Sequence, residues 1–181
     1  MKKSAQTYGT ESDKQEQHYL NRMRSHSSKY LEFHWSSVEL LINLNYTYDV
    51  IHFHLERKIG SWGLSPGAFN LLVILSQFVR EGCPMHELGE LLMVSRANIT
   101  GLVDWLTRRG LVARIEDKND RRVRLIQLTK DGEKLLESLL PSYYSIVQEM
   151  FKGVSNKDKD QLSDLLIKLR RNSQHSLERY R

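Results

Sequence analysis

Hydrophobic residues recur with helical spacing along most of this chain and alternate only in two short runs near its middle. Apolar positions three and four residues apart indicate helices. The predicted helices span 30–59, 66–80, 84–93, 95–109 and 133–151, with a last helix after Ser155. The runs 111–115 and 123–128 have the alternation and β-branched content of strands. The pattern therefore predicts a mainly α protein that carries one β-hairpin.

Polar and small residues mark where the predicted helices begin and end. Ser65, Ser95 and Thr129 stand at helix starts, where a side-chain oxygen can accept a free backbone amide. Gly110 follows the 95–109 helix at the position where a left-handed residue ends many helices. Pro141 predicts either a bend or a break in a later helix.

The helix predicted over 95–109 has one apolar stripe and one small, polar face. Residues off the stripe near its N-terminus carry groups that match the edges of DNA bases. Arginine pairs with guanine, asparagine pairs with adenine, and an alanine or threonine methyl group can touch the thymine methyl group. The outward residues are Arg96, Ala97, Asn98, Thr100, Gly101 and Asp104. A solvated face in an ordinary domain is the alternative interpretation.

The segment between the two predicted strands, 116–122, is too polar to be buried. An arginine held out on such a hairpin tip fits a narrow, electronegative minor groove. Asp117 or Asp120 can pair with one arginine of the tip and thereby orient the other. A solvated hairpin, whose surface ion pairs contribute little to stability, is the alternative.

The order of these landmarks resembles the wing signature of the MarR (multiple-antibiotic-resistance regulator) family. That signature is an Asp, a short gap, Asp-Arg-Arg, a strand and Leu-Thr-x-x-Gly, and this chain has DKNDRR at 117–122 and LTKDG at 128–132. Upstream landmarks match as well: Leu64-Ser65, Glu87-Leu88, Ile99-Thr100 and Gly110-Leu111-Val112. The resemblance is specific over 64–132, whereas the flanking helices match only as patterns.

The resemblance implies a winged helix-turn-helix transcriptional regulator. The implied fold class is mainly α (α+β), with a two-stranded β-wing flanked by long N-terminal and C-terminal dimerisation helices. The predicted organisation is a polar, partly disordered extension at 1–29, a dimerisation helix at 30–62, the DNA-binding region at 63–132, and C-terminal dimerisation helices with a basic tail at 133–181. The excess apolar surface of the long helices also favours a twofold partner. One larger monomeric core is the alternative.

Most of the predicted site residues belong to the helix-turn-helix and the wing. The predicted DNA contacts are Ser65, His86, Ser95, Arg96, Ala97, Asn98, Thr100, Gly101, Arg108, Lys118, Asn119, Arg121 and Arg122. By resemblance to the family wing, Arg122 enters the minor groove and Arg121 pairs or meets phosphate, although the reverse order stays open. Asp117 and Asp120 are predicted to brace the wing.

The family commonly binds phenolic or lipophilic ligands between the dimer helices and the DNA-binding region. By position, the residues that could line such an effector site are Tyr48, His52, Trp62 and Phe69. Core packing is the alternative role for each of these side chains. The histidines His52 and His54 are two residues apart and diverge on a helix, so they do not form a pair of metal ligands.

Charge and cysteine content narrow the function further. The chain has 27 basic and 22 acidic residues, a net charge of +5, which is compatible with a polyanionic partner. Eight basic and four acidic residues fall within 95–124, where DNA is expected to bind. The single cysteine, Cys83, excludes an internal disulfide framework. We expect it to be structural, although its place at a helix start could lower its thiol pKa.

Neither a membrane span nor a signal-peptide core is recognisable, which predicts a cytoplasmic protein. No nucleophile–base set, Gly-rich phosphate loop or cofactor motif is present in the sequence, so we do not expect an enzyme. The sequence therefore predicts a sequence-specific regulator that binds double-stranded DNA. It is expected to act as a homodimeric repressor on a palindromic operator, with release by a small ligand. A winged-helix module that binds protein, or binds DNA only non-specifically, is the alternative.

Overall fold

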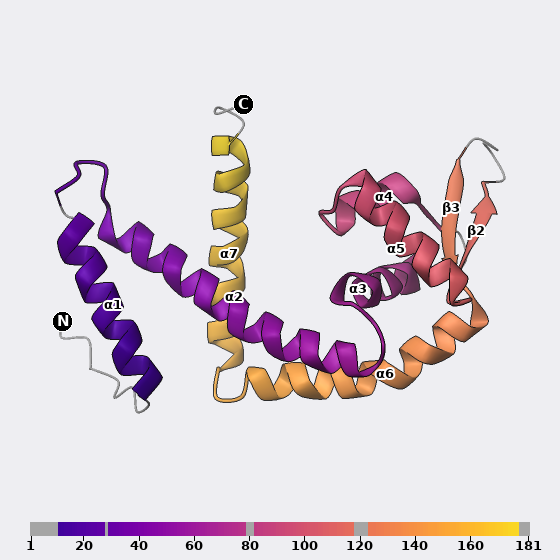
Figure 1. The fold of residues 1–181 in the computed structure, drawn as a ribbon, viewed down its shortest axis with the longest axis horizontal. Coiled ribbons are helices and arrows are strands. Elements are labelled where there is room, and N and C mark those ends of the chain that lie inside the picture. Colours follow the sequence, from indigo (N-terminus) through magenta and orange to yellow (C-terminus); the bar gives the residue numbers. More distant parts are fainter. Residues whose placement is uncertain (1–10, 28, 79–81, 118–122, 178–181) are drawn as a thin grey trace. The chain divides into compact units, whose positions relative to one another are not determined.

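The computed structural model describes residues 11–27, 29–78, 82–117 and 123–177 (Figure 1). The chain divides into two compact units, Met1–Leu64 and Ser65–Arg181, and each is described by itself. Among the described residues, no single helix is long and apolar enough to cross a membrane. By length and composition, only the consecutive helices Trp35–Ser61 and Pro66–Phe78 taken together could do so.

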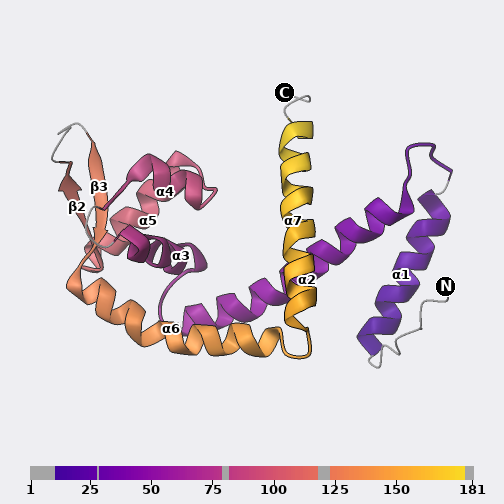
Figure 2. The ribbon, with the colours of Figure 1, turned by 180° about the vertical axis from the view of Figure 1, so that it is seen from behind.

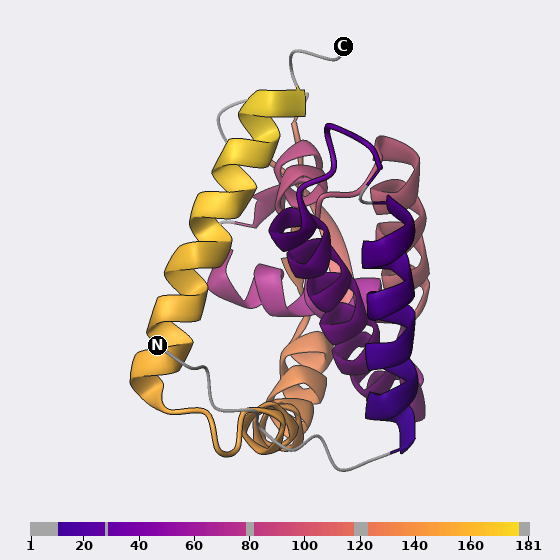
Figure 3. The ribbon, with the colours of Figure 1, turned by 90° about the vertical axis from the view of Figure 1, so that its left-hand side faces the viewer.

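The first unit contains two helices, α1 (Glu11–Ser27) and α2 (Trp35–Ser61). Figure 1 and Figure 3 both show α1 next to the beginning of α2. The sequence predicted a polar, partly disordered extension over 1–29 and no helix within it, so the helix at Glu11–Ser27 is an element that sequence reasoning missed. Leu20 is only 4% exposed, and the Arg24 guanidinium lies 5.5 Å from the centre of the Trp35 ring. A polar segment is thus held as a helix by a buried leucine and a cation–π contact, which its composition alone does not indicate.

α2 begins five residues later than the sequence pattern suggested. The backbone amide of Tyr30 donates to the Ser27 carbonyl, and the amide of Phe33 donates to the Tyr30 carbonyl, both at 3.1 Å. These hydrogen bonds close turns between the two helices, so the apolar residues at 30–34 belong to the connection.

The second unit contains the predicted winged helix-turn-helix and two further helices. Its elements are α3 (Pro66–Leu75), a 3-10 turn (Ser76–Phe78), β1 (Cys83–Pro84), α4 (Met85–Leu91), α5 (Arg96–Arg108), β2 (Val112–Glu116), β3 (Arg124–Leu128), α6 (Lys130–Met150) and α7 (Asn156–Leu177). Helices α3, α4 and α5 pack together, with the wing strands beside α5 (Figure 2). Phe69, Leu72, Leu88, Ile99 and Ile126 are at most 1% exposed and form the centre of this core. The predicted order of the helices and the two wing strands in this unit is confirmed.

The small sheet has three strands, whereas the sequence predicted two. Its order is β1-β3-β2, and both pairings are antiparallel. Cys83 pairs with Ile126, and Pro84 pairs with Leu125. A strand of two residues has no alternation to detect, and its proline lacks a backbone donor. The sequence therefore predicted only a turn, and pairing with β3 is what makes this segment a strand.

The Cys83 side chain is fully buried at this third strand. Burial of the thiol and, to a smaller extent, the neighbouring Glu87 carboxylate together raise the pKa of Cys83 to about 11. Its sulfur donates a weak hydrogen bond to the Pro84 carbonyl at 3.7 Å. The possibility of a lowered thiol pKa is therefore wrong, and the thiol is a neutral part of the core.

The exit of α5 and the start of α6 are joined by a tight backbone contact. The Thr129 hydroxyl donates to the Gly110 carbonyl at 2.6 Å and accepts the Gly132 amide at 3.0 Å. The Thr129 amide donates to the Leu111 carbonyl at 3.1 Å. A Cβ atom on Gly132 would lie 2.1 Å from the Leu111 carbonyl oxygen, so only glycine fits there. The Leu-Thr-x-x-Gly pattern is thus a packing requirement.

The two C-terminal helices agree with the predicted pattern, with two differences. Helix α6 continues through Pro141, so of the two predicted alternatives, a bend or a break, the break does not occur. Helix α7 is capped by Ser155, whose hydroxyl accepts the Asp158 amide at 3.2 Å and donates to its carboxylate at 2.6 Å. It continues to Leu177, so much of the predicted basic tail is helical.

Replacing Gly132 with alanine should lower the free energy of unfolding by about 1–3 kcal/mol, because the added methyl group must displace the Leu111 carbonyl. Urea denaturation measures this change. Gly101→Ala is the matched control, since no atom lies within 4 Å of a Cβ built there. That control should be neutral or stabilising by up to ~1 kcal/mol. Equal stability of the Gly132 variant and the unchanged protein would contradict the packing argument.

Native Cys83 should resist thiol reagents at pH 8–9, whereas the urea-unfolded chain should react readily, because the folded pKa is near 11 and the unfolded one near ~8.5. The raised pKa also affects stability. The stability that the neutral thiol contributes to the folded state is fully present below the unfolded pKa and is lost as the pH rises through the folded pKa. Cys83→Ala should remove this alkaline loss of stability. Rapid labelling of the native protein at pH 8 would show that the thiol is accessible and overturn the assignment.

Candidate nucleic-acid interface

The N-terminal turn of α5 presents polar groups to solvent on a fixed backbone. Ser95 caps the helix as predicted, because its hydroxyl accepts the Asn98 amide at 3.3 Å. Arg96, Ala97 and Asn98 are exposed, whereas Ile99 is 1% exposed and anchors the helix to the core. The exposed group is therefore held on a helix whose opposite face cannot rotate away from the core.

Two further predicted DNA contacts on α5, Thr100 and Gly101, differ in which of their atoms remain available for DNA. The Thr100 hydroxyl donates to the Arg96 carbonyl at 2.9 Å, and it also lies 3.8 Å from the Met85 sulfur. Its hydroxyl is thus engaged inside the protein, which leaves the methyl group for contacts outside. Gly101 is exposed, and nothing lies within 4 Å of a Cβ built on it, so it permits a close approach to the helix.

A hollow of ≈ 880 Å³ lies between the helix-turn-helix and the wing. Four basic side chains from different elements line it: His86 from α4, Arg96 from α5, Arg114 from β2 and Arg124 from β3. The structure thus brings together two predicted residues, His86 and Arg96, with two that were not singled out. The alternation along the strands is the signal that could have identified the two additional arginines, because both are exposed while their neighbours turn inward.

Two ion pairs hold the base of the wing. Arg114 pairs with Asp104, which joins strand β2 to helix α5. The Arg124 Nη1 atom lies 2.7 Å from the Glu116 Oε1 atom, across the β2–β3 pair. These side chains are 38–57% exposed, so each pair adds little to stability. Their geometric effect is larger, since a paired guanidinium has a defined direction.

The predicted wing residues are only partly within the described structure. The Asp117 amide donates to the Val123 carbonyl at 3.2 Å, which extends the pairing of the two strands toward the tip. The remaining predicted tip residues, Lys118, Asn119, Asp120, Arg121 and Arg122, lie outside the described residues. Bracing by Asp117 and Asp120 therefore stays a prediction, and the pairs that the structure describes lie nearer the body of the domain.

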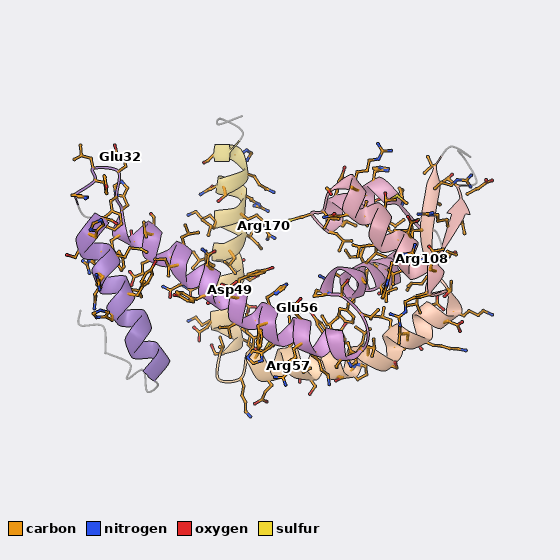
Figure 4. All side chains as sticks on the ribbon, in the orientation of Figure 1. Glu32, Asp49, Glu56, Arg57, Arg108 and Arg170 are labelled. Atoms are coloured by element: carbon orange, nitrogen blue, oxygen red, sulfur yellow. The ribbon has the colours of Figure 1, made fainter. Side chains whose placement is uncertain are left out.

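Two further predicted contacts lie at helix ends. Ser65 caps α3, where its exposed hydroxyl accepts the Ala68 amide at 3.2 Å. Arg108 is exposed in the last turn of α5 and is labelled in Figure 4. The following residue, Arg109, lies over the Trp105 ring at 4.7 Å from its centre. Of these two adjacent arginines, one is therefore packed on an aromatic ring and the other projects into solvent.

The predicted effector residues occupy different environments. On α2, the ring of the exposed Tyr48 lies 5.2 Å from the ring of the half-buried His52, centre to centre. The His52 Nδ1 atom is 3.6 Å from the Glu56 Oε2 atom. Trp62 is half-buried, with the Lys58 ammonium 5.6 Å from its ring centre. Phe69 is fully buried in the second unit and packs on Tyr143 at 4.9 Å. An effector site made from these residues stays a prediction.

Comparison with known proteins identifies the family to which this chain belongs. A sequence model of the MarR family matches residues 64–123. The chain is 30% identical over 141 residues to the HTH-type transcriptional repressor YetL of Bacillus subtilis, which covers 78% of this chain and 84% of YetL. The solved structure of the transcriptional regulator BldR from Sulfolobus solfataricus has a TM-score of 0.65 and 28% identity, and covers 75% of this chain and 96% of BldR.

A second solved structure carries a ligand. It is CouR from Rhodococcus jostii RHA1 bound to p-coumaroyl-CoA, with a TM-score of 0.65 and 26% identity, and it covers 72% of this chain and 90% of CouR. The matched family model begins at residue 64, just before the helix-turn-helix, and continues into the wing tip. Sequence, fold and site geometry therefore agree, and the chain belongs to the MarR family of winged helix-turn-helix transcriptional regulators.

Proposed function

We propose that this regulator is a homodimeric repressor that binds a palindromic operator in double-stranded DNA and is released by a small ligand. Because its target is chromosomal DNA, we place its action in the cytoplasm. The observation that carries the proposal is the N-terminal turn of α5, where Arg96, Ala97 and Asn98 stand exposed above a fully buried anchor. These are side chains suited to hydrogen bonds and methyl contacts in the major groove.

The basic hollow beside α5 supports backbone contacts on both sides of the recognition helix. His86, Arg96, Arg114 and Arg124 line it, and Arg114 and Arg124 form ion pairs with Asp104 and Glu116. Phosphate contacts set the register of a protein on DNA but carry no sequence information. We therefore assign base reading to the start of α5 and positioning to the wing base, with Arg108 and Ser65 as additional phosphate contacts.

Exposed apolar surface supports the homodimer. Helix α2 leaves large apolar side chains in solvent, namely Leu40, Leu41, Tyr46, Tyr48, Val50 and Phe53. Helix α7 leaves Leu162, Leu165, Leu166 and Leu169 at least 38% exposed. Apolar patches of this extent usually mark an interaction surface. A second copy of the chain is the partner that also gives two recognition helices for two half-sites.

Ligand release is the part of the proposal drawn from relatives. CouR, which has the same fold, is bound to p-coumaroyl-CoA in its structure. An aromatic or lipophilic effector is the class we propose here, with Tyr48, His52, Trp62 and Phe69 as the side chains to examine first. The alternative, a module that binds protein or DNA without sequence preference, is separated by the next experiment.

Selection from a random DNA library should yield a palindromic operator that binds two chains per duplex, as measured by sedimentation. Arg96→Ala and Asn98→Ala should each weaken operator binding by about 1–3 kcal/mol, roughly 5- to 150-fold, and relax the preference at particular positions. Lys134→Ala, an exposed change on α6, is the control and should leave specificity intact. Equal weakening of operator and random DNA by both variants would make these residues phosphate contacts. Absence of any selected sequence would favour the alternative module.

The Asp104–Arg114 pair should act as one unit in DNA binding. We expect Asp104→Asn to weaken operator binding although it removes a negative charge near DNA, because the released Arg114 loses its direction and the wing base loses its tie to α5. In the Asp104→Asn protein, Arg114→Gln should weaken operator binding less than it does in the unchanged protein. The coupling energy from this double-mutant cycle should be about 0.5–3 kcal/mol. Glu149→Gln, which removes the same charge from the Lys152 pair on α6, is the control. Tighter binding by Asp104→Asn would refute this role.

A further inference from the structure

A basic surface lies in the first unit, on α1 and the residues that follow it. It consists of His18, Arg22, His26 and Lys29, which line one hollow of ≈ 960 Å³ on the first unit. From Gln17 to Leu31 the sequence contains no aspartate or glutamate. Within the part of the chain that the structure describes, no carboxylate lies within ion-pair distance of Arg22 or Lys29. The Lys29 ammonium lies 5.2 Å from the Tyr30 ring centre, and Glu16 and Glu32 border the segment in sequence. The α1 basic surface is therefore a region of net positive charge.

Helical spacing aligns three of these side chains. His18, Arg22 and His26 are four residues apart, so they occupy one face of α1 in a row about 12 Å long. Arg24 projects from a different face and lies over the Trp35 ring, so it serves to hold the helix. The row is consequently separate from the contact that orders α1. Histidine adds an N–H donor when neutral and two when protonated, beside the guanidinium donors.

The form of the hollow favours an extended polyanion over a small molecule. Sites for small ligands enclose most of the ligand surface and place a few polar groups in an apolar lining. Here His18, Arg22, His26 and Lys29 are all exposed, and the aromatic lining residue Tyr19 is 50% exposed. Exposed cations act mainly through charge and release of counterions, which is how proteins bind the DNA backbone. Phosphates recur every ~3.4 Å of axis along each strand, so a row of this length can meet several of them.

Cations near the C-terminal end of a helix are also favoured by the helix dipole, which is the purely structural explanation for their presence. That explanation needs charge only in the last turn, at Arg24 and His26. It does not account for the alignment of His18 and Arg22 with that turn, or for the hollow they share with Lys29.

We infer that the α1 basic surface binds the phosphate backbone of DNA outside the segment held by the winged helix-turn-helix. The inference rests on the proposed function, since it assumes that the protein is bound to an operator. It adds a second, sequence-independent contact from a part of the chain that lies outside the matched family segment 64–123. Operators with longer flanks are then bound more tightly than isolated operators, without any change in base preference.

The test compares Arg22→Gln/Lys29→Gln with the unchanged protein on two duplexes. One ends at the boundary of the protected operator, and the other extends it by about two helical turns on each side. On the extended duplex the variant should bind several-fold more weakly at low salt, and the slope of log affinity against log salt should fall by about four units, two for each protomer of the dimer. On the short duplex both proteins should bind alike. Lys134→Gln/Lys157→Gln removes two exposed charges elsewhere and should reproduce neither change.

Arg22→Lys keeps the charge and should retain most of the extended-duplex affinity, and circular dichroism verifies that α1 remains helical in each variant. Equal loss on both duplexes, or no loss on either, overturns the inference. Calorimetry with inorganic pyrophosphate tests whether the surface binds a small anion instead of DNA. If the variant loses pyrophosphate binding but keeps its affinity for the extended duplex, the inference is also overturned. If no operator can be selected, the proposed function fails separately. The slope is then measured on a random-sequence duplex of the extended length, where a decrease of about four units for a bound dimer still supports the α1 contact.

Discussion

The contact between Gly132 and the Leu111 carbonyl is the constraint on which the DNA-binding unit depends. It brings the start of α6 against the exit of α5 so closely that no side chain fits between them. The Thr129 hydroxyl bonds to both sides of this contact, at Gly110 and at Gly132. The two strands of the wing leave and return through this junction. The direction of the wing relative to the recognition helix is therefore set by backbone atoms, which cannot repack as side chains do.

Charge refines the geometry that this junction establishes. The wing base carries two arginines paired with carboxylates, one to α5 and one across the strands. Each pair is solvent-exposed and is therefore worth little as stabilisation. Its effect is to hold a guanidinium in one direction next to a hollow that also contains His86 and Arg96.

The stability of the chain is distributed unevenly. Most of the fully buried side chains belong to α3, α4, α5 and the small sheet, whereas α2 and α7 keep many apolar side chains in solvent. The buried Cys83 thiol, held neutral at the edge of the sheet, belongs to the first group. The homodimer that we propose needs a rigid unit to meet DNA and a separate apolar surface to meet another copy. These two requirements account for the contrast between its helices.

The sequence by itself determined the elements whose signals are local. The apolar stripe of α5, the caps at Ser95 and Thr129, the glycine at Gly110 and the alternating strands were all predictable, because each depends on residues within a few positions of one another. The landmarks around them also sufficed to identify the family. The outward set at Arg96 and Asn98 followed from the same helical spacing.

Tertiary structure alone decided the features that depend on residues far apart in the chain. Strand β1 exists because Cys83 meets Ile126, and α1 is held where Arg24 meets Trp35. The pairing of Arg114 with Asp104, and the meeting of His86 with Arg124 around one hollow, likewise join separate elements. Periodicity and capping report only on neighbours in sequence, and two-residue strands or single ion pairs leave no periodic trace. Their formation depends on the close backbone packing that places those elements side by side.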